Sequence, residues 1–316
     1  MSRTRTPTRS GRRRRPLTDA ERAERRERDR KRLEEATRAL QSSEGWQRWV
    51  AIRRHNGLSR YSANNQFLLV CEAWARGIEL SYVAGYRWWA EHGYQVRKGE
   101  RALGVLAPLV HKATDEETGE RVRRVVGFRG VAVFDRSQVG AGPDAMPIEP
   151  PVAEPLGGDS HAELLPKLEA FSASLGVSVS LGEEIPGSAA RGFFRHSEKR
   201  IVIAPDEPNA MLRTLLHELA HAMVAAKHPE KGRAVDGLLL DYAEEECVVE
   251  CTGHIAASAV GLDTSGEAVS YCAGWGEGGK LAVVAEAARL IDELAHRLEE
   301  AMGVGAEDVG PEAVAS

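Results

Sequence analysis

The 316-residue chain contains no long hydrophobic run. A helix that crosses a bilayer needs about 18 or more consecutive apolar residues, and no stretch of this sequence approaches that length. A secretory signal would place an apolar segment directly after the arginines near the amino terminus, and none follows them. We therefore expect a cytoplasmic protein that has no membrane partner.

Cysteine is also scarce. Four cysteines are present, and none of them forms a Cys-x-x-Cys pair: Cys71, Cys247, Cys251 and Cys272. This spacing does not indicate a thiolate zinc site or a disulfide framework. We interpret the cysteines as small buried side chains in a reducing compartment, in preference to a metal or disulfide role. The sequence contains no internal repeat.

Charge is divided unevenly along the chain. Residues 1–139 hold 30 lysines and arginines against 17 aspartates and glutamates, a net charge of +13. Residues 140–316 hold 12 against 30, a net charge of −18, so the overall value of −5 conceals two unlike halves. A cationic half joined to an anionic half suggests a polyanion-binding module followed by an enzyme module.

Aromatic residues follow the same division. Five of the six tryptophans lie in the basic half, together with four tyrosines: Trp46, Trp49, Trp74, Trp88, Trp89, Tyr61, Tyr82, Tyr86 and Tyr94. Single-stranded nucleic acid binds such a mixture, because bases stack on rings for about 1–3 kcal/mol each while cations follow the phosphates. The alternative is that these rings are core, and we expect more than half of them to be buried. Trp88 and Trp89 would point to opposite faces of a strand, but the argument weakens if they lie in a helix.

Local composition predicts two folded domains. The Arg-rich arm at residues 1–16 should be disordered, and it either adds salt-dependent affinity for DNA or is a solvated tail. Thr18 and Glu21 form a capping box for a charged helix that runs to about Gln41, within a first domain at 17–139. Prolines and glycines then mark a linker at 140–159. We expect a second domain at 160–303 and a disordered tail at 304–316.

The most informative motif is His217-Glu218-Leu219-Ala220-His221. Two histidines four residues apart on a helix project from one face, where both imidazoles can hold one Zn²⁺. Glu218 then lies where it can take a proton from a metal-bound water. The alternative is a buried helix with two satisfied histidines. Pro208 suits the first turn of this helix, and a buried stripe recurs along it at Met211, Leu215, Leu219 and Met223.

Two short strands are predicted before the metal-binding helix. Residues 191–195 and 200–204 have strand-like patterns, and residues 196–199 form the turn between them. A strand beside the metal-binding helix is useful to a peptidase, because an extended substrate can pair along its edge.

A second predicted helix, at residues 241–261, offers the third protein ligand that a catalytic zinc site requires. Tyr242, Glu246, Glu250 and His254 fall at four-residue intervals and therefore share one face. Buried carboxylates are costly unless they are paired or bind a metal. We favour Glu246 as the ligand, and Glu250 as the residue that orients a ligating histidine. The alternative is a solvated acidic face, for which Glu244 and Glu245 are better candidates than Glu246.

Residues of both halves resemble the ArdC-type antirestriction proteins. In the second half, the similar segments are His-Glu-Leu-Ala-His, Tyr-Ala-Glu-Glu-Glu-Cys-Val-Val-Glu at 242–250, Leu-Asp-Thr at 262–264 and Tyr-Cys-Ala-Gly-Trp at 271–275. In the first half, they are Tyr-Ser-x-x-Asn-Gln-x-Leu-Leu at 61–69, Gly-x-x-Val-Arg-Lys-Gly-Glu at 93–100 and Val-Phe-Asp at 133–135. The resemblance runs from about residue 40 to about residue 278, and the ImmA/IrrE-like metallopeptidases that cleave repressors are more distantly similar.

The resemblance implies an α+β protein of two domains. The first would be a single-stranded-DNA-binding domain with a small antiparallel sheet, and the second a minimal zincin-like metallopeptidase domain in which Glu246 completes the zinc site. Together with the aromatic and basic pattern, it suggests six DNA-binding residues: Tyr61, Asn65, Gln66, Trp88, Arg97 and Lys98. Arg97 and Lys98 fit a solvated turn equally well.

The resulting hypothesis is an antirestriction-type protein of mobile elements such as plasmids, which coats single-stranded DNA and hydrolyses an unidentified protein substrate. Glu218 would be the general base beside Zn²⁺, and either Tyr242 or Tyr271 would stabilise the oxyanion. One alternative is an ImmA/IrrE-like regulatory protease that cleaves a repressor. Another is a non-catalytic DNA-binding protein with structural zinc, against which Glu218 argues because a structural site has no use for a base.

Overall fold

The computed structural model describes residues 18–40, 42–53, 58–114, 121–148, 154–227, 242–264 and 281–304, and it has a mixed α+β architecture. The strands of these residues form three small sheets. The predicted arm at 1–16 and the 271–275 segment lie outside the described residues, as does nearly all of the predicted tail at 304–316. Among the described helices, none combines the length and the apolar character that crossing a bilayer demands.

Three helices open the described chain: α1 (Asp19–Ala39), α2 (Ser43–Arg53) and α3 (Ala63–Ala75). The predicted capping box begins α1, because Thr18 Oγ1 accepts the Glu21 backbone N–H while the Glu21 carboxylate accepts the Thr18 N–H. The helix ends at Ala39, close to the predicted end. In α3 the buried face is largely apolar, and Phe67 and Leu69 are fully buried.

The first half contains two antiparallel sheets, in agreement with the sheet type expected for it. Strands β1 (Val83–Gly85), β4 (Arg121–Asp135) and β3 (Leu103–Thr114) pair in the order β1-β4-β3. Strands β2 (Tyr94–Val96) and β5 (Val139–Ala141) form a separate pair. Helix α4 (Tyr86–Glu91) follows β1, and a single 3-10 turn, η1 (Arg136–Gln138), connects β4 to β5.

Side chains from α3 cover part of the open edge of β3. Glu72 accepts the backbone N–H of Gly104 at 3.1 Å. Asn65 accepts the backbone N–H of Leu106 at 2.8 Å and donates to the carbonyl of the same residue at 3.0 Å. Pro108 follows two residues later and has no N–H. Unpaired edge groups invite pairing with other chains, so these residues close the edge where it passes α3.

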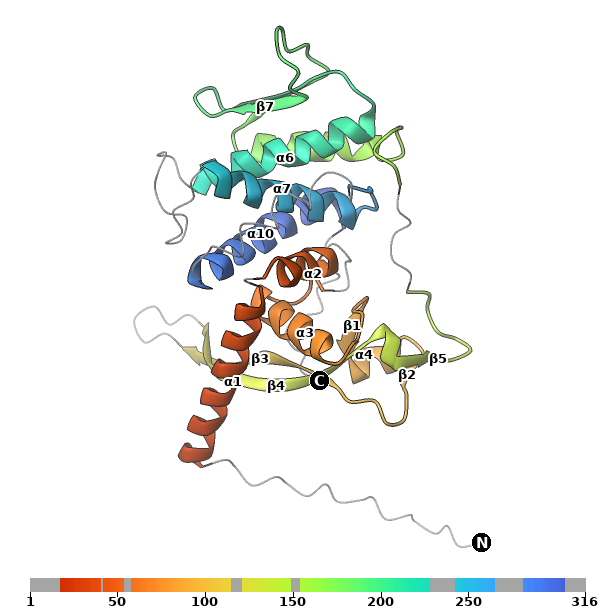
Figure 1. The fold of residues 1–316 in the computed structure, drawn as a ribbon, viewed down its shortest axis with the longest axis vertical. Helices are drawn as coiled ribbons and strands as arrows, with labels where there is room; N and C mark the ends of the chain where they lie inside the picture. The colour runs from red at the N-terminus through yellow and green to blue at the C-terminus, as the bar shows by residue number, and fades with distance from the viewer. Residues whose placement is uncertain are drawn as a thin grey trace, which may run out of the picture.

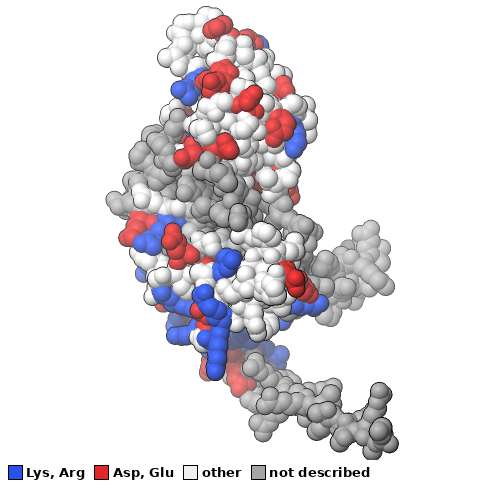
Figure 2. Space-filling model, turned by 90° about the vertical axis from the view of Figure 1, so that its right-hand side faces the viewer, with Lys and Arg blue, Asp and Glu red and all other residues white. Residues whose placement is uncertain are grey.

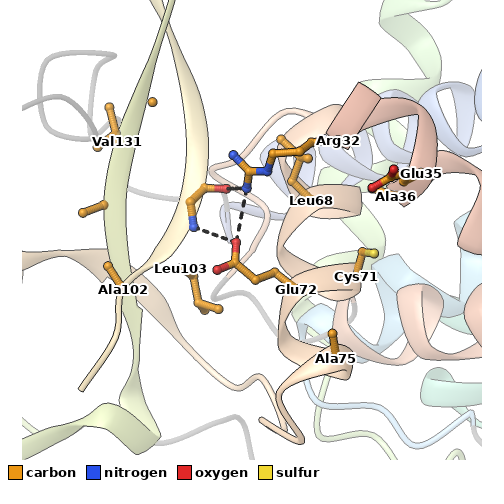
Figure 3. Close-up of a pocket in the computed structure, with 13 residues that line it drawn as sticks. Arg32, Glu35, Ala36, Leu68, Cys71, Glu72, Ala75, Ala102, Leu103 and Val131 are labelled. Carbon is orange, nitrogen blue, oxygen red and sulfur yellow. Dashed lines mark hydrogen bonds and ion pairs between the residues drawn. The ribbon is translucent and has the colours of Figure 1, made fainter. Parts of the chain in front are cut away.

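A pocket of about 540 Å³ lies between α1, α3 and the β3–β4 sheet. Figure 3 shows Arg32 extending from α1 to Glu72 at 3.3 Å and to the carbonyl of Gly104 at 3.5 Å. Leu68 and Cys71 line the helical side. The ion pair is partly exposed and therefore contributes little stability, although it connects α1 to α3 and to the sheet.

The second half begins with a 3-10 turn, η2 (Ala162–Leu164), and helix α5 (Leu165–Ser174). A three-stranded sheet follows, with strands β6 (Ser178–Leu181), β7 (Gly192–Arg195) and β8 (Arg200–Ile203). Strand β8 is central, parallel to β6 and antiparallel to β7, so β7 forms one edge. Three long helices complete the described chain: α6 (Pro208–Lys227), α7 (Tyr242–Ala259) and α10 (Leu281–Met302).

One hydrophobic core cluster contains residues from both halves of the chain. It joins Trp46 and Trp49 of α2 and Phe67 of α3 to apolar side chains of α6, α7 and α10. Figure 1 shows α10 as a layer between α7 on one side and α2 and α3 on the other. The domain limits at 17–139 and 160–303 stay a prediction, but the two halves pack on each other through α10.

Candidate metal centre and nucleic-acid interface

Helix α6 presents His217 and His221 beside its buried face. Leu215, Leu219 and Met223 of the predicted stripe are fully buried, which fixes how the helix is rotated against the core. Both histidines are only partly buried, with side chains that are 21% and 16% exposed. Solvent or a ligand can therefore reach both imidazoles.

Helix α7 brings Glu246 to the two imidazoles. His217 Nε2 lies 3.8 Å from Glu246 Oε2, and His221 Nε2 lies 3.5 Å from Glu246 Oε1. One ligand atom from each of the three residues lies within 4.8 Å of the other two. These are the three residues expected to hold the metal ion, and the structure brings them together.

The other nitrogen of each imidazole bonds a different glutamate. His217 Nδ1 donates to Glu250 at 2.9 Å, and His221 Nδ1 donates to Glu245 at 3.0 Å. These bonds place a hydrogen on each Nδ1, so in the neutral imidazoles each Nε2 keeps its lone pair for a metal ion on the side where Glu246 lies. Carboxylates that hold ligating histidines in this way are typical of metal sites. Arg213 donates in turn to Glu250. Burial alone would raise the pKa of Glu250, but the bond from His217 and the charge of Arg213 lower this pKa overall.

Sequence reasoning missed Glu245, which it assigned to a solvated face. The available signal was the histidine pair itself, since each ligating imidazole needs an acceptor for its second nitrogen. For His221, burial alone would lower the pKa, but the Glu245 bond and the nearby carboxylates of Glu218 and Glu246 raise it overall.

Glu218 is buried at 7% exposure and lies beside both imidazoles and Glu246. Burial raises the pKa of Glu218, although the imidazoles and a hydrogen bond from the backbone N–H of Phe194 act in the opposite direction. Phe194 belongs to β7, the edge strand of its sheet. Glu218, the expected general base, is therefore hydrogen-bonded to β7, the edge strand along which an extended chain could pair.

The remaining members of the predicted polar face lie outside the ligand cluster. Tyr242 is 77% exposed at the first residue of α7. His254 is buried two turns beyond Glu246, and its ring bonds the hydroxyl of Thr264. Tyr271, the other residue considered for the oxyanion, lies outside the described residues.

Three of the six residues suggested for DNA binding serve the fold instead. Tyr61 is buried and its hydroxyl donates to the carbonyl of Val83 at 3.0 Å. Gln66 is fully buried, accepts from Trp49 and donates to Asp292 of α10. The side chain of Asn65 forms hydrogen bonds with the backbone of Leu106 at the edge of β3. The conspicuous segment at 61–69 thus positions α3, and the expectation that Tyr61 and Gln66 contact DNA needs correction because both are inaccessible.

Trp88 and Trp89 lie in helix α4, not in a strand. Trp89 is fully buried and donates to the carbonyl of Phe134 at 3.0 Å. Trp88 is partly exposed and stacks on His92, with ring centroids 3.7 Å apart and planes 17° apart. Arg97 and Lys98 are exposed in the turn after β2, where Arg97 donates to the carbonyl of Ser137.

Charged side chains are distributed unequally over the surface. Figure 2 shows lysine and arginine gathered at the end of the molecule that carries α1 and the β3–β4 sheet, and acidic side chains more prominent at the end that carries α6 and β7. The charge asymmetry of the sequence therefore persists in space, and the basic half presents a surface suited to a polyanion.

Comparison with known proteins is consistent with the resemblance seen in the motifs. Residues 27–134 match the family model of the N-terminal domain of anti-restriction factor ArdC. An uncharacterized protein, y4eC, of Sinorhizobium fredii (strain NBRC 101917 / NGR234) is 32% identical over 229 residues, which cover 65% of this chain and 67% of that protein.

Two solved structures are also similar, both of the antirestriction ArdC protein from the R388 plasmid. The metal-free structure is 23% identical, with a TM-score of 0.43, and the alignment covers 78% of this chain and 87% of that one. The Mn(II)-bound structure is 23% identical, with a TM-score of 0.42 and coverage of 77% and 85%. On the strength of the domain match and the relative, the chain belongs to the family of ArdC-type antirestriction proteins.

Proposed function

We propose that the protein is a zinc-dependent endopeptidase with a zincin-like second half. One observation carries the proposal: His217 and His221 direct Nε2 toward Glu246, while other glutamates hold both Nδ1 atoms. Two imidazoles and one carboxylate form a donor set of catalytic zinc sites, which keep a further position for water. The residues present therefore fit a divalent metal ion.

The chemistry follows from the groups around this centre. A divalent ion, when bound, supplies polarisation of the scissile carbonyl and acidifies water. Glu218 accepts the proton of the attacking water and passes it to the leaving amine. Burial raises the pKa of Glu218, which favours proton uptake, and the Phe194 N–H orients its carboxylate. An extended substrate can pair along β7 beside it.

Replacement of Glu218, the proposed general base, tests the peptidase proposal. Glu218→Gln should retain the metal and lose hydrolysis by about 100-fold or more, because an amide cannot accept the proton. Metal content is measured by mass spectrometry of the purified proteins, and hydrolysis is followed with an unfolded protein such as β-casein. Glu198→Gln, in the exposed turn between β7 and β8, is the matched control and should hydrolyse like the wild type. Equal hydrolysis by Glu218→Gln and the wild type would show that Glu218 is not the general base. No hydrolysis by the metal-loaded wild type would favour a structural role for zinc.

We further propose that the first half binds single-stranded DNA and that this binding serves antirestriction. A cluster of rings and one cation supports this function. The Arg60 guanidinium lies 4.4 Å from the centroid of the Tyr82 ring and 5.4 Å from that of Trp88. Tyr86, on the same short helix as Trp88, is 57% exposed. Exposed rings beside cations are what unpaired bases require for stacking.

Binding of the full-length protein to a fluorescent oligothymidylate, measured over a series of salt concentrations, tests this second function. Affinity should fall as salt rises, because phosphate contacts release counterions. Tyr86→Ala should weaken binding on the order of tenfold, since a stacked base contributes about 1–3 kcal/mol. Phe128→Ala is the control, because Phe128 is similarly exposed, at 58%, on β4. Salt-insensitive binding, or equal losses in both variants, would contradict the proposed surface.

A further inference from the structure

A pocket of about 270 Å³ adjoins the metal centre, on the side toward the start of α6. It shares His217 and Glu218 with that centre, and its opposite wall is the beginning of β7. A side chain next to the scissile bond of a peptide on β7 would therefore enter this pocket. Its lining decides which side chain is accepted.

Two arginines line the pocket from different elements. Arg213 projects from α6 and is 7% exposed, and Arg191 lies at the exposed rim directly before β7. One guanidinium nitrogen of Arg213 donates to Glu250, while its buried Nε has no hydrogen-bond partner among the described residues. A buried donor without a partner is costly unless a ligand or water satisfies it.

The carboxylates in the pocket are already engaged. Glu250 accepts from Arg213 through one oxygen and from His217 through the other, and Glu218 accepts from the backbone of Phe194. Arg191 forms no ion pair within the described part of the chain. Among the described residues, the Arg191 charge therefore has no carboxylate partner, and the buried Nε of Arg213 has no acceptor.

The rest of the lining is small or apolar and includes Leu156, Ala210 and Thr214. Gly192 keeps β7 close to α6, since a Cβ at this position would lie 2.7 Å from Thr214 Cγ2 and 3.0 Å from Ile203 Cδ1. The lining thus combines two arginines with small and apolar residues, which suits a carboxylate on a short aliphatic stem.

We propose that this pocket selects an aspartate or glutamate side chain that flanks the scissile bond, with Arg191 as the residue that determines specificity. The proposal rests on the proposed peptidase function, whose site it shares. The bound side chain places its carboxylate against the exposed Arg191 guanidinium, and Arg213 forms part of the wall behind it. A lysine or arginine at this position of the substrate is rejected by the same two cations.

Cleavage of an acetylated and amidated peptide library by the metal-loaded full-length protein tests the proposal, because blocked ends remove the terminal carboxylate as a competing ligand. Mass spectrometry of the products should show Asp and Glu enriched on the order of tenfold at one flanking position, the size expected for a charge-assisted hydrogen bond. Arg191→Glu should abolish this enrichment and admit Lys or Arg. Arg195→Glu, the same change at the exposed far end of β7, should leave the enrichment unaltered.

A binding measurement separates selection from turnover. With the Glu218→Gln variant, a fluorescein-labelled peptide that contains Glu should bind about tenfold more tightly than its Gln counterpart in fluorescence anisotropy, and Arg191→Glu in the same background should remove the difference. Cleavage without acid enrichment, or equal binding of the two peptides, overturns the pocket proposal and leaves the peptidase standing. Absence of both cleavage and binding overturns the peptidase and the pocket together.

Discussion

At the scale of single residues, the metal centre depends on how its histidines are held as much as on the ligands. Each Nδ1 is bonded to a glutamate of α7, so in the neutral rings each Nε2 carries no hydrogen and lies toward Glu246. A ring that rotated freely would present this geometry only part of the time. The two outer glutamates therefore prepare the imidazoles for a metal ion before one binds.

Removing one of these acceptors should weaken metal binding while leaving the ligands intact. Glu245→Ala takes away the partner of His221, and losses of this kind typically cost about 10- to 100-fold in metal affinity. Competition for zinc with a chromophoric chelator measures the effect. Glu244→Ala, one position earlier on α7, is the control and should bind zinc like the wild type. Unchanged affinity in Glu245→Ala would show that the Glu245 bond does not prepare His221.

At the scale of helices and strands, much of the second half is predictable because its signals are local. The strands expected at 191–195 and 200–204 are present as β7 and β8, and Pro208 begins α6 as predicted. The face of α7 that carries Glu246 and Glu250 follows from helical spacing alone. Glu245 could not be found in this way, because it lies about 100° around the helix from Glu246 and only the position of α6 brings His221 to it.

The first half shows why some motif residues are misread. Tyr61 forms a hydrogen bond with Val83, and Gln66 forms one with Asp292, both far away in the sequence. No local pattern reveals such contacts. The Trp88–Trp89 pair fits a strand or a helix equally well by composition. The conspicuous polar residues at 61–69 thus indicate the fold of this family more than a DNA contact, and the exposed rings of α4 are the better candidates for stacking.

At the scale of the whole molecule, the two halves are joined by buried charge as well as by the shared core. Arg53 of α2 is fully buried and bonds two carboxylates of α10, Asp292 at 2.5 Å and Glu299 at 2.7 and 3.0 Å. Gln66 adds a bond to Asp292 at 2.8 Å. Helix α10 also packs beside α7, which carries three glutamates of the metal centre. Separating the halves would break this buried ion pair and expose the shared core to water.

Replacement of Arg53 tests how strongly this contact joins the halves. Arg53→Met should lower the free energy of unfolding at neutral pH by about 3–5 kcal/mol, the usual cost of removing one partner from a buried ion pair. Urea denaturation followed by tryptophan fluorescence measures the loss. Arg38→Met, which removes the exposed pair with Glu34, should cost no more than about 1 kcal/mol. Equal losses in the two variants would mean that the buried pair contributes no more than a surface one.

The pH dependence of stability in the wild type and in Arg53→Met tests whether Glu299 causes the loss of stability in acid. Burial opposes ionisation of Glu299, but Arg53 and His296 lower the pKa of Glu299 below its ordinary value of 4.5. A carboxyl whose pKa is lower in the folded state contributes stability above its unfolded pKa, and that contribution disappears as the pH falls through the folded value. The wild type should therefore lose stability in the acidic range below 4.5 more steeply than Arg53→Met, in which Glu299 lacks its cation and takes up a proton at higher pH. Urea midpoints at successive pH values should converge for the two proteins on acidification, and parallel curves would assign the acid sensitivity to other carboxylates.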